Sequence, residues 1–266
     1  MGQNVRRISL PVRLTLPFRI LEEALDLLFP PRCAGCGRPG AFWCAACAAA
    51  VIPIMPPVCP GCGIPWPEGD RCPTCRADPP RLAGIRSACL YRGPLRRAVH
   101  RLKFHGRYAV ARALAPLMAD GWTRFALEAD LLIPVPAHRG RERQRGYNQA
   151  ALLAEALAEH LSLPVHPEAL RRVRATPSQV GLDHLARRAN VQGVFQADPR
   201  WIAGRRVAVI DDVCTSGATL EACAAALYQA GAVAVWGFTL ARVILRRSLS
   251  IPLGGAYGAD RAGTEH

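Results

Sequence analysis

The chain has 266 residues, half of them hydrophobic, which excludes wholesale disorder and suffices for one good-sized domain plus a smaller module. Its net charge of +14 favours a polyanionic partner, although plain solubility or the arginine-rich usage of a GC-rich genome would give the same excess. Eight of the eleven cysteines form four Cys-x-x-Cys pairs, which indicates metal binding in a reducing compartment rather than the disulfides of a secreted protein.

The N-terminal arm, residues 1–30, contains no sequence of the signal-peptide type, because charged side chains interrupt its apolar residues. No run in the chain approaches the length of a membrane span, so we expect a soluble, cytoplasmic protein. The apolar residues Phe18, Leu21, Leu25 and Leu28 recur at helical spacing and predict a short amphipathic helix that packs on its neighbours.

The four cysteine pairs follow between residues 31 and 78. Thiolates two residues apart on a tight turn clasp one tetrahedral Zn²⁺, so four pairs predict two closed, structural sites. Sequential pairing follows the repeat, whereas a cross-braced arrangement would use more comfortable loop lengths; both remain open, as does iron–sulfur or redox use as a minor alternative. The expected zinc ligands are Cys33, Cys36, Cys44, Cys47, Cys59, Cys62, Cys72 and Cys75.

A strongly basic stretch follows the expected linker Asp78-Pro79-Pro80, with no acidic residue before Asp120. Residues 87–91 predict a strand, and a helix is expected from Gly93 to Phe104. Arg97, Arg101 and His105 share one face of that helix and are suited to a phosphate backbone, with a solvated face that covers part of the sheet as the alternative. The expected nucleic-acid contacts are Arg97, Arg101, Lys103, Arg107 and Arg143.

The middle of the chain predicts helices over residues 108–125 and 150–161, with a buried strand over residues 131–136 between them. An arginine-rich loop, residues 138–149, follows that strand, and its guanidinium groups are suited to a pyrophosphate; Arg145 is the candidate ligand. Residues 168–195 are polar and basic, which is consistent with either a mobile lid or an ordinary exposed connector.

The most informative segment runs from Val207 to Thr219. Four apolar residues predict a buried parallel strand, two acids follow at its carboxyl end, and a hydroxyl- and glycine-rich turn leads into a helix over residues 220–230. Amides at a helix N-terminus, together with neighbouring hydroxyls, cradle a phosphate, and adjacent carboxylates suit ribose hydroxyls, directly or through Mg²⁺. A last strand over residues 232–240 and a loose tail from about residue 246 complete the chain.

This segment resembles the 5-phosphoribosyl-1-pyrophosphate (PRPP) signature of type I phosphoribosyltransferases. The acids Asp211 and Asp212 are the candidate catalytic residues and ribose ligands. The expected ligands of PRPP as a whole are Asp211, Asp212, Thr215, Ser216, Gly217, Ala218, Thr219 and Arg145.

The chain as a whole, from about Leu21 to Arg242, resembles the ComF family of double-zinc-ribbon, phosphoribosyltransferase-like competence proteins. The segments that carry the resemblance are the cysteine pairs, residues 101–106, 134–136, 145–149, Thr176-x-x-Gln179, Arg187-x-x-Asn190 and residues 211–219. Ser216 stands where a threonine is common, which keeps the hydroxyl, and Cys214 is a second small departure.

The resemblance implies an α/β fold of the type I phosphoribosyltransferase kind, a parallel sheet flanked by helices, behind a small N-terminal double zinc ribbon. It also implies PRPP with Mg²⁺ as ligand, a role in handling incoming single-stranded DNA during natural transformation, and competence partners such as a ComF-type helicase. The expected division is an arm at 1–30, the zinc ribbon at 31–78, the transferase-like domain at 81–245 and a tail at 246–266.

Whether the protein is an enzyme stays open at this point. One hypothesis is an Mg²⁺-dependent transferase with an unidentified acceptor, for which the sequence offers no convincing base or acceptor pocket. The other is a DNA-binding competence factor in which the pocket senses PRPP or binds a DNA phosphate, and the basic stretch and zinc ribbons favour it.

Overall fold

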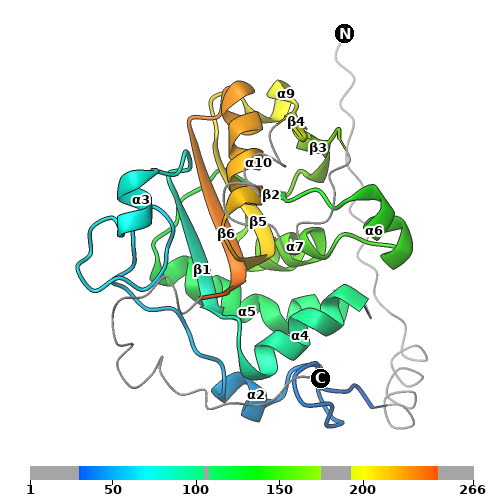
Figure 1. The fold of residues 1–266 in the computed structure, drawn as a ribbon. Coiled ribbons are helices and arrows are strands. Elements are labelled where there is room, and N and C mark those ends of the chain that lie inside the picture. Colours follow the sequence, from blue (N-terminus) through cyan, green and yellow to red (C-terminus); the bar gives the residue numbers. More distant parts are fainter. Residues whose placement is uncertain (1–29, 105–107, 175–192, 245–266) are drawn as a thin grey trace.

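The computed structural model describes residues 30–104, 108–174 and 193–244 (Figure 1). Four strands form its main sheet in the order β1-β6-β5-β2, and every pair of neighbours in it is parallel. The strands are β1 (Gly84–Leu90), β2 (Leu131–Pro134), β5 (Arg206–Cys214) and β6 (Ala234–Arg242). The two longest strands, β5 and β6, therefore lie in the middle, and the acidic segment of β5 is in the interior of the sheet.

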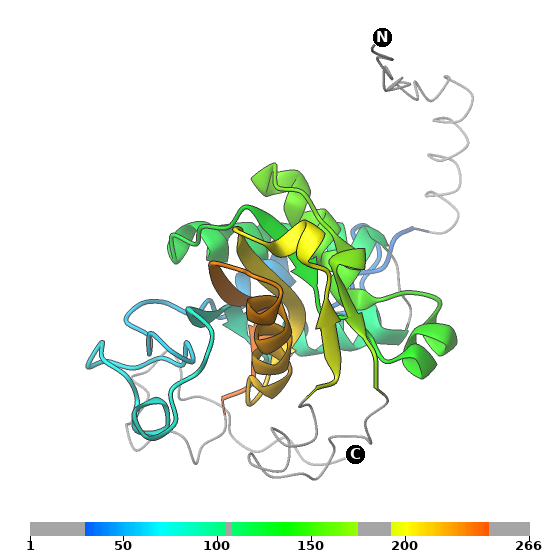
Figure 2. The ribbon, with the colours of Figure 1, turned by 90° about the horizontal axis from the view of Figure 1, so that it is seen from above.

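Helices cover both faces of this sheet, as the views in Figures 1 and 2 show. The longer helices are α4 (Gly93–Phe104), α5 (Tyr108–Arg124), α7 (Gln149–Leu161) and α10 (Ala218–Gln229). The shorter elements are α2 (Ala45–Ala49), α3 (Pro73–Ala77), α6 (Arg139–Arg145), the 3₁₀ turn η1 (Pro167–Ala169), α9 (Pro199–Ile202) and the antiparallel pair β3 (Leu170–Arg172) and β4 (Phe195–Ala197).

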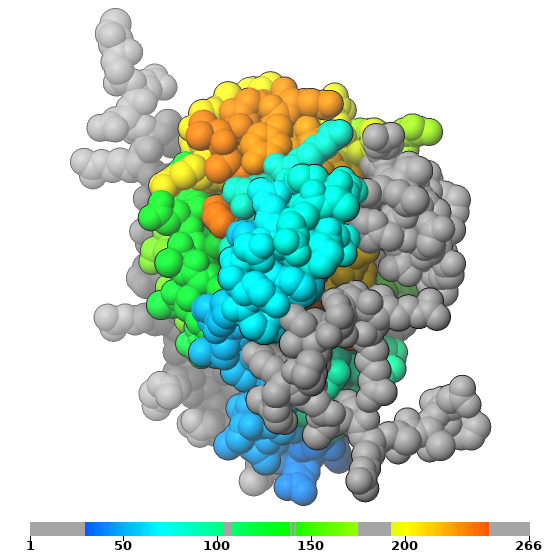
Figure 3. Space-filling view, turned by 60° about the vertical axis from the view of Figure 1, so that its left-hand side comes forward, coloured from blue at the N-terminus to red at the C-terminus, as the bar shows by residue number. Residues whose placement is uncertain are grey.

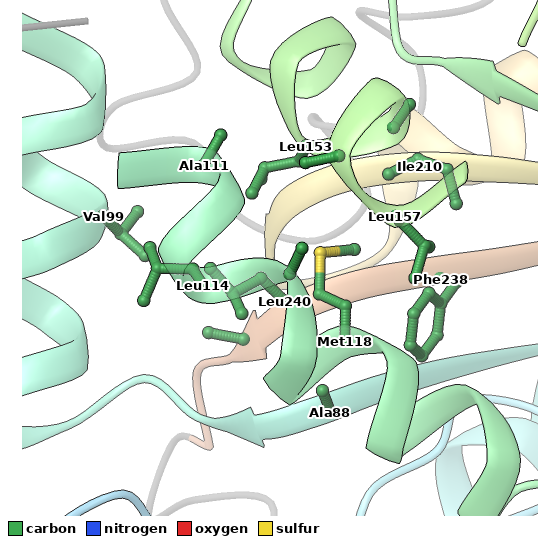
Figure 4. Packing of buried hydrophobic residues seen from close by; sticks show 14 of the residues in the cluster. Ala88, Val99, Ala111, Leu114, Met118, Leu153, Leu157, Ile210, Phe238 and Leu240 are labelled. Atoms are coloured by element: carbon green, nitrogen blue, oxygen red, sulfur yellow. The ribbon is translucent and has the colours of Figure 1, made fainter. Parts of the chain in front are cut away.

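Alternation along the strands divides the core into two layers, because successive side chains of a strand point to opposite faces. Ile210, Phe238 and Leu240 face α5 and α7, where Met118 and Leu157 pack on them (Figure 4). The other set of strand positions packs with α10 on the opposite face; it consists of Ile85, Leu131, Ile133, Val207, Val209 and Val235. Apolar side chains dominate both layers, and the buried hydroxyls of Ser87 and Thr239 hydrogen-bond each other at 2.6 Å.

The cysteine-rich segment covers the outer edge of β1. The Ile54 amide donates to the Ala88 carbonyl at 3.0 Å, the Leu90 amide donates to the Ile52 carbonyl at 2.8 Å, and the Ile85 amide donates to Gly61. An unpaired strand edge is a template for aggregation, and these bonds satisfy it with the zinc-ribbon chain instead. In the space-filling view this segment forms a lobe against the side of the sheet domain (Figure 3).

The predicted strands and helices are confirmed within a few residues, with three differences. The segment expected as an arginine-rich loop contains the short helix α6, which begins after His138 and ends at Gly146. The stretch expected as a lid or connector contributes β3 and pairs with β4. The acid pair lies inside β5 rather than after it, because pairing with β6 continues to Cys214.

Some expectations fall outside the described residues. These are the amphipathic helix before Pro30, the contacts of His105 and Arg107, the motifs in residues 175–192 and the tail. The division of the chain into four parts likewise stays a prediction.

Candidate functional site

The carboxyl end of β5 and the first turn of α10 bring the predicted phosphate ligands together. Residues 215–217 form a bend, and Gly217 occupies the N-cap of α10 with φ +83°. Ser216 Oγ accepts a bond from the Ala218 amide at 3.4 Å, while the Thr215 side chain is exposed and Thr219 half-buried. Helix amides and three hydroxyls thus lie at one end of a twelve-residue helix, an arrangement suited to an anion.

Glycine is required at position 217 for two reasons. Its positive φ is rarely adopted by other residues, and a Cβ added there would lie 2.8 Å from Ile85 Cδ1. The turn at residues 215–217 therefore packs directly against the side chain of Ile85.

Replacing Gly217 with alanine is expected to lower the free energy of unfolding by about 1–3 kcal/mol, because it adds backbone strain and a clash. Gly204→Ala is the matched control, since Gly204 has φ +74° but nothing within 4 Å of an added Cβ. Urea denaturation of both variants separates the clash from the backbone cost; equal losses would contradict the close contact with Ile85.

The acid pair carries an internal counter-charge; Asp212 is buried and Asp211 is half-buried. Asp211 Oδ1 accepts a bond from the Asp212 amide at 2.8 Å, and Asp212 is 4% exposed. Lys103 Nζ, from the end of α4, lies 2.9 Å from Asp212 Oδ2. Burial, and then repulsion from Asp212, raise the pKa of Asp211 well above its usual range. Burial opposes the charge of Lys103, yet attraction to Asp212 and Asp211 outweighs it and raises the Lys103 pKa.

Lys103 is expected to contact nucleic acid; the structure places its ammonium group in this ion pair, and the nucleic-acid contact stays a prediction. Lys103→Met is expected to lower the free energy of unfolding by about 3 kcal/mol, because it leaves a buried carboxylate without a partner. Lys103→Arg keeps the charge and should retain most of the stability. Urea denaturation of the two variants is the measurement, and two curves that match the wild type would contradict the role of this pair.

Arg97 and Arg101 also have structural partners. Arg97 Nε donates to the Gly35 carbonyl and Arg101 Nη1 to the Cys33 carbonyl, both at 2.5 Å. The basic face of α4 therefore holds the first zinc knuckle against the sheet domain. Arg97 is exposed and Arg101 half-buried, and nucleic-acid binding by these two arginines stays a prediction.

The arginine-rich segment after β2 is fixed by its neighbours. Arg145 Nη1 donates to Gln149 Oε1 at 3.0 Å, and Tyr147 donates its hydroxyl proton to the Leu102 carbonyl at 2.7 Å. Asn148 caps α7 by accepting from the Ala150 amide. Arg143 is exposed on α6. A pyrophosphate contact by Arg145 stays a prediction.

The eight predicted zinc ligands form two compact sets in sequential order. Cys33, Cys36, Cys44 and Cys47 make the first, and Cys59, Cys62, Cys72 and Cys75 the second; within each, the sulfur atoms all lie within 4.8 Å of one another. The sulfurs of Cys36 and Cys44, and those of Cys62 and Cys72, are 3.7 Å apart. Four thiolates about 2.3 Å from a tetrahedral ion are spaced in this way, so both sets fit structural Zn²⁺. The cross-braced alternative does not occur.

The protein environment lowers the pKa of one thiol in each set, Cys33 in the first and Cys62 in the second, and raises the pKa of Cys47, Cys72 and Cys75. Burial opposes ionisation of Cys33, yet backbone N–H groups of Cys36 and Cys44 lower its pKa to about 6. A hydrogen bond with Cys75 is the main cause that lowers the pKa of Cys62 to about 5. Thiolates are the form that binds zinc, so each set contains a ligand already ionised at neutral pH.

The three cysteines outside these sets are buried, as expected, and are Cys89, Cys214 and Cys223. Sequence reasoning missed a partner of Cys214: Arg242, 4% exposed at the end of β6, donates from Nη1 to Cys214 Sγ at 3.1 Å. The signal that could have revealed this contact was the charged Arg242 at the end of an otherwise mostly apolar strand.

Comparisons with known proteins agree with this architecture. Residues 24–76 match the family model of the double zinc ribbon domain. DNA utilization protein YhgH of Escherichia coli O157:H7 is 33% identical over 179 residues, which cover 65% of this chain and 78% of that protein. Competence protein F of Haemophilus influenzae is 34% identical over 160 residues, covering 57% and 70%.

Among solved structures, the glutamine PRPP amidotransferase of Bacillus subtilis is similar over 52% of this chain, with 20% identity and a TM-score of 0.37. The match spans 30% of the amidotransferase chain.

A parallel sheet flanked by helices, preceded by two four-cysteine sets, defines an α/β protein with an N-terminal double zinc ribbon. Within that class, the chain belongs to the family of DNA utilization protein YhgH and competence protein F, as the ComF resemblance predicted. None of the described helices has the length and apolar composition needed to cross a bilayer.

Proposed function

We propose that this protein binds PRPP at the turn between β5 and α10 and also binds single-stranded DNA, and that it handles incoming DNA in the cytoplasm during natural transformation. The observation that carries the ligand assignment is the position of Asp211 and Asp212 beside the hydroxyl-lined N-terminus of α10. The names of its relatives, DNA utilization protein and competence protein F, support the DNA role.

The proposed mode of binding assigns one part of PRPP to each part of the site. The 5′-phosphate accepts bonds from the amides and hydroxyls of residues 215–219. The ribose hydroxyls donate to Asp211 and Asp212, and Mg²⁺ brought with PRPP would supply positive charge near these acids. Lys103 balances Asp212 in the absence of ligand and competes with the incoming cation, since both are attracted by the same carboxylates.

Calorimetric titration of the zinc-loaded protein with PRPP, with and without Mg²⁺, tests this assignment. We expect saturable binding with Mg²⁺ and weaker binding without it. Ribose 5-phosphate should bind more weakly, because it lacks the pyrophosphate. No heat of binding from millimolar PRPP in the presence of Mg²⁺ would overturn the proposal.

Transfer chemistry is the second candidate function, and the raised pKa of Asp211 favours it, because burial and repulsion from Asp212 make this carboxylate a stronger proton acceptor than an ordinary aspartate. Pyrophosphate release from PRPP in the presence of nucleobases or of single strands decides between the two. Pyrophosphate release with one of the acceptors would define an enzyme, whereas no release with any acceptor, together with tight PRPP binding, would define a sensor.

The DNA proposal rests on charge. The protein carries 14 more basic than acidic side chains, and the exposed Arg143 projects from α6. Fluorescence anisotropy with a labelled single-stranded oligonucleotide should give an affinity that falls steeply as salt rises, because phosphate contacts release counterions. An affinity unchanged between low and moderate salt would overturn the phosphate-contact model.

Arg143→Gln combined with Arg107→Gln should weaken this DNA binding and reduce its salt dependence. Arg205→Gln is the control, since Arg205 is exposed and directly precedes the first residue of β5, at the end of that strand away from the phosphate turn. Arg97 and Arg101 are unsuitable for this test, because their loss would release the first zinc knuckle.

A further inference from the structure

The second zinc knuckle, defined here as residues 59–63, packs directly on the backbone of β1. The Ile85 amide donates to the Gly61 carbonyl at 2.8 Å. Gly63, with φ +72°, lies so close to β1 that an added Cβ would be 2.1 Å from the Ile85 carbonyl oxygen. Arg86 Nη1 donates to the carbonyls of Pro60 at 3.0 Å and Ile85 at 2.9 Å. The knuckle therefore fixes the position of Ile85 from one side.

The side chain of the same residue packs against the phosphate turn. Ile85 is 2% exposed, and its Cδ1 atom lies 2.8 Å from the position that a Cβ would occupy on Gly217. It packs in the apolar cluster that contains Cys214 and Ala218, the residues on either side of the bend. The knuckle thus contacts the backbone of Ile85, and the turn contacts its side chain.

The knuckle owes its shape to its metal ligands. Cys59 and Cys62 enclose Gly61, and Gly63 donates its amide to the Cys59 carbonyl at 2.9 Å. A small segment with little apolar core depends on zinc for a defined fold. Loss of the ion from the second site would therefore release the group that positions Ile85.

We propose that the second zinc centre positions the phosphate turn through Ile85, so that filling of this zinc site and binding of a phosphate ester at residues 215–219 are coupled. Ile85 is a positioning residue in this scheme and touches no ligand. By linkage, a ligand at the turn strengthens zinc retention at the second site by the same factor by which zinc strengthens the ligand. The ligand half of this coupling rests on the proposed function; the effect of the zinc knuckle on the turn does not.

Hydrogen exchange of the zinc-loaded, ligand-free protein tests whether the zinc knuckle positions the phosphate turn. Ile85→Val removes Cδ1 and keeps the backbone bonds to the knuckle, so amides of residues 214–219 should exchange about fivefold faster or more. Ile202→Val is the matched control: it removes the same methyl group from the same apolar cluster, but at the end of α9, before β5 begins. A merely structural role would change global unfolding in urea in both variants and leave exchange at the turn unchanged.

Measurements of zinc content and PRPP binding test whether the second zinc site and the ligand site are coupled. Cys75→Ser should retain one zinc ion per chain and show the faster exchange at residues 214–219. Ile85→Val should retain two zinc ions and bind PRPP about tenfold more weakly, with no such loss in Ile202→Val. Exchange at the turn that matches the wild type in both Ile85→Val and Cys75→Ser would overturn the coupling. If Cys75→Ser does not fold, Ile85→Val alone decides.

The two proposals fail in different ways. Wild-type protein that binds no PRPP overturns the ligand assignment, while the exchange comparison still decides whether the zinc knuckle positions the turn. If the wild type and Ile85→Val bind PRPP equally tightly and show equal hydrogen exchange at the turn, the ligand assignment stands and the coupling is overturned.

Discussion

Replacement of both Asp211 and Asp212 with asparagine is expected to abolish measurable PRPP binding, at least a 100-fold loss of affinity, while both zinc ions stay bound. The physical reason is that the two carboxylates are the acceptors for the ribose hydroxyls and the attraction for a cation that accompanies the ligand. A 100-fold loss corresponds to about 2.7 kcal/mol of binding free energy. Calorimetric titration with PRPP and Mg²⁺ is the measurement.

Two controls make this result interpretable. Asp130→Asn changes a carboxylate at the opposite end of the sheet, where it pairs with Arg206 at 2.9 Å, and should leave PRPP binding unchanged. Zinc content and circular dichroism of the double variant check folding, because Lys103 loses its charged partner there. Loss of zinc would show that the variant had misfolded, and an unchanged affinity in a folded variant would contradict the role of the acid pair.

Removal of zinc with a tight chelator is expected to unfold both ribbons and to lower the melting temperature by tens of degrees. Structural zinc supplies on the order of 10 kcal/mol of folding free energy in small modules of this kind. The loss also uncovers the outer edge of β1, whose backbone is paired with residues 52–61 in the folded protein. Thermal unfolding followed by light scattering should therefore show aggregation as well as a lower midpoint.

Readdition of Zn²⁺ before heating is the control for this experiment and should restore the original midpoint. A protein from which both zinc ions have been removed, as measured by metal analysis, and which melts at the same temperature would contradict the structural role of the ribbons.

The sequence was informative wherever local residue pattern decides structure. Apolar runs predicted the strands β2 and β5, Gly93-Pro94 marked the start of α4, and the hydroxyl- and glycine-rich residues predicted the turn before α10. The Cys-x-x-Cys spacing predicted both metal sets, because a tight turn and two thiols are local features. These features need no knowledge of how distant segments pack.

The remaining features depend on contacts between distant segments, which spacing does not reveal. The pairing of β3 with β4 spans residues 173–194, and the ion pair of Lys103 joins residues more than one hundred positions apart. The same applies to Arg97 and Arg101: a stripe of arginines on a helix predicts a phosphate surface or a solvated face equally well. Only the position of the first ribbon shows that backbone carbonyls are their partners.

The order of the strands also bears on how the protein is made. β1, the first strand of the sheet to be synthesised, pairs within the sheet with β6, the last one, so that hydrogen-bonded ladder cannot close until residue 242 has left the ribosome. The ribbons, by contrast, have all their ligands once residue 75 has emerged. If the nascent chain binds zinc early, the folded ribbons can pair with the outer edge of β1 before β6 has been synthesised. This pairing covers the edge of β1 while the chain waits for its long-range partner.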